Sequence, residues 1–328
     1  MAFNAKSGAA RVAVMGAGAV GSYFGGMLAR SGVHVTFITR PAHADAIRAN
    51  GLFMDTLTFK ERVTVECATD PSSVKDAEFV LFSVKTLDTE DAARAIAAQL
   101  APGAIVVSLQ NGVDNVARIR AASGIDAIPA VVYVAAAIPE PGRIKHSGRG
   151  ELIIGDFPGS AHAQDPQPTR TGRVAALFTG AGVPCKVSDN IEADLWTKMV
   201  MNCAGNPITA IAQTSYGHAA RNPETRELMR KVIEESVAVA RASGVRLPDV
   251  DMAEAGLKLA ETLGEATSST AQDLARGKRT EIDSLNGYIV RRGAELGIAT
   301  PVNFALHALV KMIEQGAERR RKPAGSAS

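Results

Sequence analysis

Six residues near the start of the chain have the types and spacing of a phosphate-binding turn. Gly16-Ala17-Gly18-Ala19-Val20-Gly21 follows a short apolar run and opens a helix-prone stretch. A strand, a tight turn and a helix in this order make a G-x-G-x-x-G match specific. Gly16 permits the turn, Gly18 lets the backbone approach a pyrophosphate, and Gly21 lets the helix pack closely on the strand. The motif therefore predicts a dinucleotide site, with phosphates at the N-terminus of the helix.

The type of dinucleotide depends on a residue about 20 positions further on, where NAD-binding chains place an acid. No Asp or Glu occurs between Gly21 and Asp45. The second predicted strand, 33–39, is followed by Arg40, whose guanidinium can hold a ribose 2′-phosphate with two charge-assisted hydrogen bonds. A solvated arginine is the usual alternative, but not at the position where this fold reads the ribose. The sequence therefore favours NADP over NAD.

Two further polar side chains follow predicted strands, at the edge where open α/β sheets bind ligands. Lys85 follows the strand 78–84 and could neutralise a cofactor phosphate or approach the nicotinamide ribose. Asn111 follows the strand 104–109 and could hydrogen-bond the cofactor or the substrate. On spacing alone, a solvated lysine explains Lys85 equally well, and a plain Asn-Gly turn explains Asn111 better.

A second polar group lies on one face of a predicted helix, 192–212. Lys198, Asn202 and Asn206 are spaced four apart and so share a face, among apolar neighbours. An ammonium and two amides facing a cleft could hold a substrate carbonyl and hydroxyls. A solvated helix face explains the stripe equally well on spacing alone. Pro207 should bend this helix near Asn206.

One later stretch offers an acid together with hydroxyl donors. Ser269 and Thr270 could donate to a carboxylate, and Glu281 would begin a helix. The residues 280–283, Thr-Glu-Ile-Asp, have the form of a capping box. An acid in the first turn of a helix is also favoured by the helix dipole alone, so the structural explanation of Glu281 competes with the functional one.

Other catalytic schemes lack their motifs. The six histidines are scattered, without an H-E-x-x-H pair or a ligand cluster, so no metal site is expected. No G-x-S-x-G elbow supports a hydrolase triad. A hydride-transfer enzyme without a catalytic histidine needs another proton donor, and Lys198 is the best candidate.

The elements that must position these residues fall into two groups along the chain. In the first half, short β-branched runs alternate with helical patterns, as in a parallel sheet with crossover helices. We therefore expect an α/β chain, with a Rossmann-type doubly wound parallel sheet over residues 11–188 that binds NADP. An all-α substrate and catalytic domain should follow over 189–320. Residues 1–10 and 321–328 should be tails, the second disordered.

Individual elements can be placed from the same patterns. The predicted strands are 11–15, 33–39, 78–84, 104–109 and 127–137. A hairpin is expected from 143–146 and 151–155 around the turn 147–150, followed by a surface loop over 158–171. The predicted helices are 20–30 in the first domain and 192–212, 223–242, 248–263, 269–276, 281–296 and 301–316 in the second.

The composition is that of an ordinary soluble globular protein. The 328 residues are 46% hydrophobic and 21% charged with a net charge of +2, which gives no case for nucleic acid or a membrane surface. The longest apolar stretch, 127–138, contains Pro129 and is too short to cross about 30 Å of hydrocarbon. An odd number of cysteines without paired spacing, and no apolar core in residues 1–10, predict a protein of the reducing cytoplasm.

The motifs together resemble the ketopantoate reductase family, the 2-dehydropantoate 2-reductases, over residues 11–314. The most specific marks are Leu195-Trp196-x-Lys198, Asn202-Cys203, Asn206-Pro207-x-Thr209-Ala210, Ser268-Ser269-x-x-Gln272-Asp273 and Thr280-Glu281-Ile282-Asp283-x-x-Asn286-Gly287. The resemblance implies an oxidoreductase that reduces 2-dehydropantoate to (R)-pantoate with NADPH, a step towards pantothenate (vitamin B5) and coenzyme A. A small 2-oxo acid is then the partner that the chain binds.

The resemblance also implies a role for each matching residue. Lys198 is the general acid, since an ammonium both stabilises the charge that develops on the ketone oxygen and delivers a proton. Glu281 is its acidic partner and contacts the cofactor. The implied substrate contacts are Asn111, Lys198, Asn202, Asn206 and Ser269. The implied cofactor contacts are Gly16, Ala17, Gly18, Ala19, Val20, Gly21, Arg40, Lys85, Asn111, Ala136 and Glu281.

One position departs from the family pattern. Tyr216-Gly217 stands where many members carry Asn-Gly with the Asn reaching the substrate, so the reaction type is intact while the exact 2-oxo acid stays open. The alternatives are a reductase of a different 2-oxo acid and a nucleotide-sensing protein that binds NADP without chemistry. The complete set of matching polar residues counts against a sensor, which needs no proton donor. A homodimer is compatible with the sequence, which identifies no interface.

Overall fold

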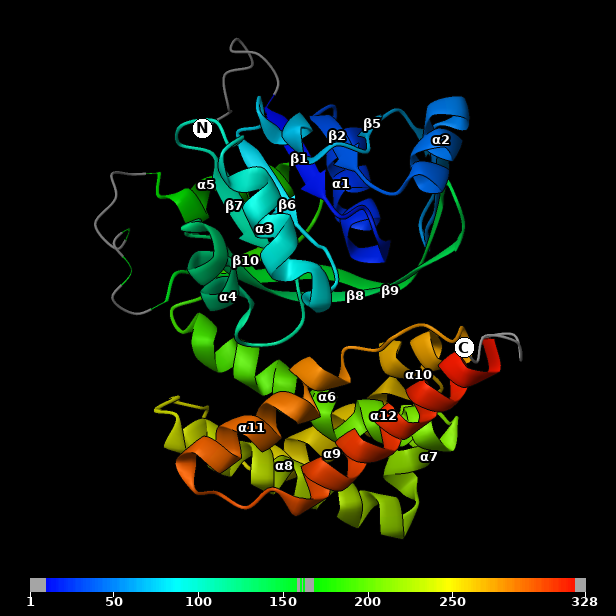
Figure 1. The fold of residues 1–328 in the computed structure, drawn as a ribbon, viewed down its shortest axis with the longest axis vertical. Helices are drawn as coiled ribbons and strands as arrows, with labels where there is room; N and C mark the ends of the chain where they lie inside the picture. The colour runs from blue at the N-terminus through cyan, green and yellow to red at the C-terminus, as the bar shows by residue number, and fades with distance from the viewer. Residues whose placement is uncertain (1–9, 158–159, 161, 163–167, 322–328) are drawn as a thin grey trace, which may run out of the picture. The chain divides into compact units, whose positions relative to one another are not determined.

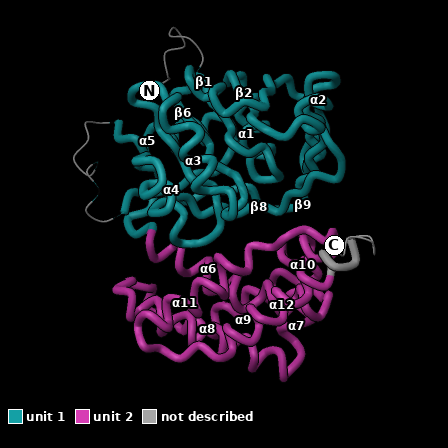
Figure 2. Tube along the Cα trace, viewed as in Figure 1, with its two compact units in different colours: residues 1–191 teal, residues 192–328 magenta. Residues whose placement is uncertain are grey.

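The computed structural model describes residues 10–157, 160, 162 and 168–321 of the chain. The chain divides into two units, unit 1 (Met1–Ile191) and unit 2 (Glu192–Ser328), shown in Figure 2. Apart from residues 10 and 321, the predicted tails 1–10 and 321–328 lie outside the described residues, as does part of the predicted loop 158–171.

A run of parallel strands forms the centre of unit 1 (Figure 1). In spatial order these strands are β5 (Glu66–Ala68), β2 (His34–Ile38), β1 (Arg11–Met15), β6 (Phe79–Phe82), β7 (Ile105–Ser108) and β8 (Ile128–Glu140). Every neighbouring pair in this run is parallel. In chain order the run reads third, second, first, fourth, fifth, sixth, which is the strand order of the Rossmann fold. The predicted sheet type and strands are confirmed.

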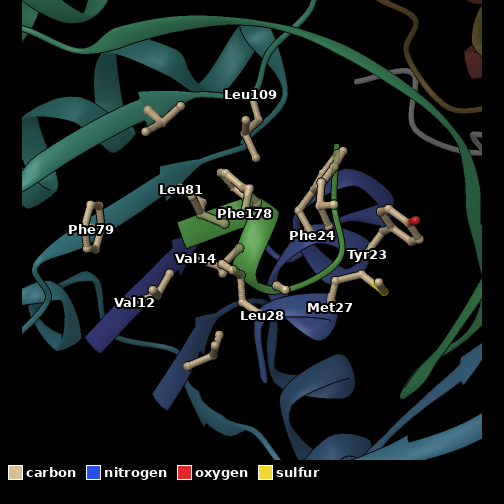
Figure 3. Close-up of a cluster of buried hydrophobic side chains, with 14 of the residues drawn as sticks. Val12, Val14, Tyr23, Phe24, Met27, Leu28, Phe79, Leu81, Leu109 and Phe178 are labelled. Atoms are coloured by element: carbon tan, nitrogen blue, oxygen red, sulfur yellow. The ribbon is translucent and has the colours of Figure 1, made fainter. Parts of the chain in front are cut away.

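Helices cover both faces of this sheet because successive side chains of a strand point to opposite sides. The helices are α1 (Ala19–Arg30), α2 (Pro41–Asn50), α3 (Thr89–Ala97), α4 (Asn115–Ser123) and α5 (Arg170–Gly180), with two 3₁₀ turns, η1 (Pro71–Val74) and η2 (Thr86–Asp88). Val14 of β1 lies in one hydrophobic core with Phe24 of α1 and Phe178 of α5 (Figure 3). Its neighbour Met15 lies in a second core, with Ile96 of α3 and residues of α4. The sheet is therefore doubly wound.

The sheet continues beyond β8 through mixed strands, where one prediction is wrong. In order from β8 these are β9 (Arg143–Ile154), β3 (Leu52–Asp55) and β4 (Lys60–Val63), and β10 (Cys185–Val187) also pairs with β9. The expected hairpin of 143–146 and 151–155 does not form, because β9 runs through both segments antiparallel to β8.

A bulge replaces the turn that was predicted there. Tyr133 pairs with Glu151 while Val134 pairs with Arg149, which leaves Gly150 as an extra residue. Arg149 and Gly150 have φ of 58° and 136°, as residues at such irregularities often do. The turn-forming sequence therefore bends a strand instead of ending it.

The described part of unit 2 is helical, as predicted. Its helices are α6 (Ile191–Ala212, which begins at the last residue of unit 1), α7 (Tyr216–Arg221), α8 (Pro223–Ala242), α9 (Met252–Leu263), α10 (Ser269–Ala275), α11 (Asn286–Leu296) and α12 (Pro301–Arg321). Among these helices, α7, which is six residues long, was not predicted from the sequence. Across both units, no helix of the described ranges combines the length and the apolar character needed to cross a membrane.

The predicted helix 281–296 is interrupted in the structure. A short 3₁₀ turn, η3 (Ile282–Ser284), precedes α11, and Leu285 between them has φ of −108° and ψ of −103°, outside the helical region. The capping box expected at 280–283 does not form, because the Thr280 hydroxyl accepts the N–H of Ile282 at 3.2 Å and no side chain caps η3. Glu281 consequently stands at the entrance of η3.

Candidate active site

The glycines of the phosphate-binding motif have different surroundings in unit 1. Gly16 has φ of +93°, and a Cβ there would lie 2.7 Å from the backbone nitrogen of Val84. A Cβ on Gly21 would lie 2.5 Å from the hydroxyl of Ser83, so helix and strand pack too closely for a side chain. A Cβ on Gly18 would meet no heavy atom within 4 Å. Gly16 and Gly21 are thus required by the fold, whereas Gly18 leaves the backbone accessible.

The backbone of this loop offers hydrogen-bond donors at the N-terminus of α1. The first N–H of the helix to bond within it is that of Ser22, which donates to the carbonyl of Gly18 at 2.8 Å. The N–H groups of residues 19–21 therefore have no acceptor in the helix. The preceding N–H groups, of residues 16 and 17, donate to the carbonyl of Ile38 at 3.0 and 3.3 Å, which ties the loop to the end of β2. With no acid in the first turn of α1, this terminus suits an anion.

The predicted ligand-binding residues of unit 1 lie after adjacent strands. Arg40 follows β2, the glycine loop follows β1, Lys85 follows β6 and Asn111 follows β7, and these four strands are neighbours in the sheet. Because the strands are parallel, their carboxyl ends meet at one edge. Arg40 and Lys85 are exposed and Asn111 is half-buried. Ala136 is half-buried on β8 and pairs with His146 of β9. Because β8 pairs with β7 at residues 128–129, Ala136 lies closer to the C-terminal end of β8 than that pairing.

A buried side chain that the sequence analysis missed joins two of these loops. The Gln110 amide donates to the carbonyl of Val84 at 3.1 Å and to the hydroxyl of Thr89 at 2.8 Å, and its oxygen accepts from Ser108 at 3.0 Å. Gln110 thereby fixes the residue before Lys85 to the residue before Asn111. No spacing rule identifies such a residue, because the partners of its amide, in the loop after β6 and at the start of α3, lie more than 20 residues away in the sequence.

A second residue that was not predicted, His43 of α2, is linked to the glycine loop through hydrogen bonds by way of Ser22. The N–H of Gly142 donates to His43 Nδ1 at 3.1 Å, so the ring proton of the neutral imidazole resides on Nε2, 3.4 Å from the hydroxyl of Ser22. Ser22 in turn donates to the carbonyl of Ala17 at 3.1 Å. Burial lowers the pKa of His43, which favours the neutral ring that this chain of bonds requires.

In unit 2 the predicted polar stripe lies on α6, which continues through Pro207 to Ala212. Lys198 and Asn202 are half-buried, and Asn206 is buried with 3% of its surface exposed. A buried amide requires hydrogen-bond partners. A solvated helix face therefore does not account for Asn206.

Asn206 is held by three hydroxyl groups from different parts of unit 2. Its backbone carbonyl accepts from Thr209 at 3.0 Å and from Ser268 at 3.2 Å, and these two hydroxyls are 2.8 Å apart. Its side-chain oxygen accepts from the phenol of Tyr216 at 2.7 Å. Ser269 is the exposed first residue of α10, directly after Ser268. The structure thus brings the predicted contacts Asn206 and Ser269 into neighbouring positions.

The segment that carries Glu281 is anchored to α12 on both sides of that residue. Before it, the N–H of Thr280 donates to the carboxylate of Glu314 at 2.6 Å. After it, the carboxylate of Asp283 accepts from His307 and Lys311, each at 2.7 Å. Burial alone would raise the pKa of Asp283, but the hydrogen bonds from Lys311 and His307 outweigh it and lower that pKa. These bonds fix the backbone that presents Glu281, which is half-buried.

The two groups of predicted residues belong to different units. The glycine loop, Arg40, Lys85, Asn111 and Ala136 are in unit 1, and the helical set from Lys198 to Glu281 is in unit 2. In the part of the chain that the structure describes, no three His, Cys, Asp or Glu side chains gather so as to hold a metal ion.

Comparison with known proteins places this chain among related sequences and structures. The family model described as ketopantoate reductase PanE/ApbA matches residues 12–159, and the model of the C-terminal part of the same family matches residues 190–314. Relatives called 2-dehydropantoate 2-reductase from Halobacterium salinarum and Archaeoglobus fulgidus are each 35% identical to this chain, over 93% of it and 99% and 98% of their own lengths.

A solved structure agrees with these relationships over both units. It is described as a PanE/ApbA family ketopantoate reductase from Ralstonia eutropha JMP134, and it is 50% identical to this chain with a TM-score of 0.86. The match covers 94% of this chain and 99% of the other. The resemblance seen in the motifs is therefore confirmed, and the chain belongs to the ketopantoate reductase family of oxidoreductases.

Proposed function

We propose that this protein reduces 2-dehydropantoate to (R)-pantoate with NADPH. The observation that carries the proposal is the row formed by Arg40, the glycine loop, Lys85 and Asn111 along the carboxyl ends of four adjacent strands. Relatives named 2-dehydropantoate 2-reductase, which match over 93% of this chain, support the substrate. The product would supply pantothenate and coenzyme A synthesis in the cytoplasm.

The described residues of unit 1 fit a nicotinamide dinucleotide. The accessible backbone at Gly18 and the N–H groups at the start of α1 suit the pyrophosphate. Arg40 would hold the ribose 2′-phosphate, since an exposed guanidinium stands where an NAD-binding chain would place an acid. Lys85, Asn111 and Ala136 would complete the cofactor contacts. In this assignment residues 11–188 form the cofactor domain and 189–320 the substrate domain.

The residues of unit 2 would hold the 2-oxo acid and supply the proton. Asn202 and Asn206 would bond its polar groups, and the Ser269 hydroxyl would donate to its carboxylate. The bound cofactor supplies a hydride for the carbonyl carbon. Lys198 would stabilise the negative charge that develops on the carbonyl oxygen and donate a proton to it. Glu281 would keep that ammonium charged and in position, which the anchoring of its segment to α12 supports.

The test is NADPH oxidation by the purified protein with 2-dehydropantoate and a panel of other 2-oxo acids. The proposal expects turnover with 2-dehydropantoate, and a much lower rate with NADH at the same concentration. A protein that binds NADPH without oxidising it in the presence of any member of the panel would instead be a nucleotide sensor. Because the complete set of polar residues is present on α6, on α10 and directly before η3, we expect turnover.

A second candidate is a reductase of a different 2-oxo acid. Tyr216 favours this possibility, because its phenol bonds directly to Asn206, one of the proposed substrate contacts. The same panel separates the two candidates: a kcat/KM at least tenfold higher for another member than for 2-dehydropantoate would identify that other acid as the substrate.

A further inference from the structure

Tyr216 occupies a closely packed position beside Asn206. It is the first residue of α7, and its hydroxyl donates to Asn206 Oδ1 at 2.7 Å. Its ring lies against Gly205, where a Cβ would be only 2.5 Å from Cε1 of the ring. A glycine at position 205 is therefore what leaves room for the phenol.

The backbone around Tyr216 is fixed as firmly as its side chain. Its N–H donates to the carbonyl of Ala266 at 3.0 Å, and the N–H of Gly217 donates to the carbonyl of Gly264 at 2.8 Å. Both acceptors belong to the loop that leads into Ser268, which itself bonds to Asn206. Hydrogen bonds thus connect Tyr216, Asn206 and the loop 264–268 into one network, in which each member limits the movement of the others.

The direction of the bond between Tyr216 and Asn206 has a chemical consequence. Burial raises the pKa of the Tyr216 phenol, so the hydroxyl keeps its proton at physiological pH and can donate. An amide oxygen only accepts, so this bond fixes which end of the Asn206 amide faces the phenol. Among the residues that the structure describes, none bonds to Asn206 Nδ2. Asn206 therefore retains N–H donors for a ligand.

We propose that Tyr216 is a positioning residue that holds Asn206 as a hydrogen-bond donor and so selects 2-oxo acids that carry a hydroxyl oxygen as acceptor. The inference rests on the proposed function, because it takes Asn206 as a substrate contact. Without the phenol the amide of Asn206 is free to rotate, so its N–H groups are no longer held ready for the hydroxyl oxygen of the substrate, and ordering them costs part of the binding energy of that bond. The discrimination would then depend on an ordered amide and not on pocket size alone.

The test compares two substrates that differ by one hydroxyl group. These are 2-dehydropantoate, which is 4-hydroxy-3,3-dimethyl-2-oxobutanoate, and 3,3-dimethyl-2-oxobutanoate. Tyr216→Phe keeps the ring against Gly205 and removes the hydrogen bond. We expect kcat/KM for 2-dehydropantoate to fall about tenfold, through KM more than kcat, because one hydrogen bond typically contributes about that factor. The value for the analogue should stay within about twofold.

Two further variants separate positioning from a general loss of structure. Gly205→Ala retains the hydroxyl but forces the ring away from its place, so it should reduce the preference for 2-dehydropantoate as Tyr216→Phe does. Tyr288→Phe also removes a phenol of unit 2 while its ring can keep the edge contact with Trp196, so the preference should be unchanged. Melting temperature and NADPH affinity are measured for each variant to verify folding.

Each outcome supports or overturns the inference. A selective loss with 2-dehydropantoate supports it. Equal losses on both substrates, or none, in folded Tyr216→Phe that binds NADPH would overturn it and leave the proposed function intact. If the unmodified protein turns over neither substrate, the proposed function fails and this inference fails with it.

Discussion

The side-chain amide of Asn286 donates to the backbone carbonyl of Cys203 at 3.0 Å. Pro207 explains this contact, because proline has no N–H and cannot donate to the carbonyl four residues before it in a helix. The carbonyl of Cys203 lies inside α6 at a buried position, where an unpaired acceptor would be costly. Asn286 therefore supplies, from the start of α11, the donor that Pro207 removes from the helix that carries Lys198.

Replacement of Asn286 should destabilise unit 2 through this carbonyl. Asn286→Ala is expected to lower the free energy of unfolding by about 1–3 kcal/mol, measured by urea denaturation, because a buried acceptor loses its partner. In a Pro207→Ala background the helix regains an N–H for Cys203, so the same change should cost less, with a coupling of about 0.5 kcal/mol or more. Strictly additive effects would mean that the two residues do not share this carbonyl.

Lys198 should affect turnover and not cofactor binding. Lys198→Ala is expected to reduce kcat about 10²–10⁴-fold, the usual contribution of a general acid, with the NADPH dissociation constant unchanged. Lys231→Ala is the matched control, since this exposed lysine of α8 pairs with Glu227 on the surface. Full turnover in Lys198→Ala would remove Lys198 from the mechanism.

Arg40 should determine the preference for NADPH over NADH. Arg40→Ala is expected to raise KM for NADPH about 10–100-fold and to leave KM for NADH nearly unchanged, because charge-assisted bonds to the 2′-phosphate are lost. Arg94→Ala removes an exposed arginine of unit 1 that pairs with Asp91 on the surface, so the KM values of this variant should equal those of the unmodified protein. An equal increase in KM for NADPH and for NADH would contradict a role of Arg40 at the 2′-phosphate.

Alanine variants of two glycines in the motif should have different effects, one on protein stability and the other on NADPH binding. Gly21→Ala places a Cβ 2.5 Å from the Ser83 hydroxyl, so the melting temperature should fall. Gly18→Ala meets no atom of the protein within 4 Å and has an extended backbone, so stability should be unchanged while NADPH binding weakens about tenfold or more. Calorimetry with and without NADPH measures both effects, and unimpaired binding by Gly18→Ala would place the pyrophosphate elsewhere.

His43 should make the stability of unit 1 depend on pH. Burial lowers its pKa below the ordinary value of 6.5, so the unfolded chain binds this proton more readily than the folded one. Stability contributed by neutral His43 is then complete above pH 6.5 and decreases as pH falls from there towards the lowered pKa. His43→Gln removes the titrating group. Between pH 6.5 and the lowered pKa, the unfolding free energy of this variant should therefore change less with pH than that of the unmodified protein. If the unfolding free energies of the variant and the unmodified protein depend on pH in the same way, His43 is not a source of the pH dependence.

Local patterns in the sequence predicted the sheet, the glycine loop and most helices of unit 2. The strand 11–15 and the glycines after it were readable because each signal involves neighbouring residues. The turn-like 147–150 was misread, since whether such a segment turns or bulges depends on the strand that pairs with it, here β8. The interruption at Leu285 was missed for a similar reason: the segment before it is fixed by α12, through the bond from Thr280 to Glu314.

The sequence predicted residues that would act on a ligand, and it did not predict residues that act on another residue. Arg40, Lys198 and Asn206 have side chains whose chemistry and position indicate a role. Gln110 and Asn286 bond to backbone carbonyls far away in the chain, which no periodicity encodes. A single buried amide in a sequence does not reveal its acceptor, so supporting residues of this kind become visible only with a structure.

The central place of β9 in the mixed part of the sheet constrains the order in which a nascent chain can fold. β9 pairs with β3, made much earlier, and with β10, made much later. While residues 56–142 are being synthesised, β3 has β4 as its partner and an open edge on its other side, and such edges recruit other chains. The sheet cannot be complete before Val187 has been synthesised, close to Glu192, where the helical unit begins. Ribosomes paused before residue 143 should therefore carry chains that depend on a chaperone to stay soluble.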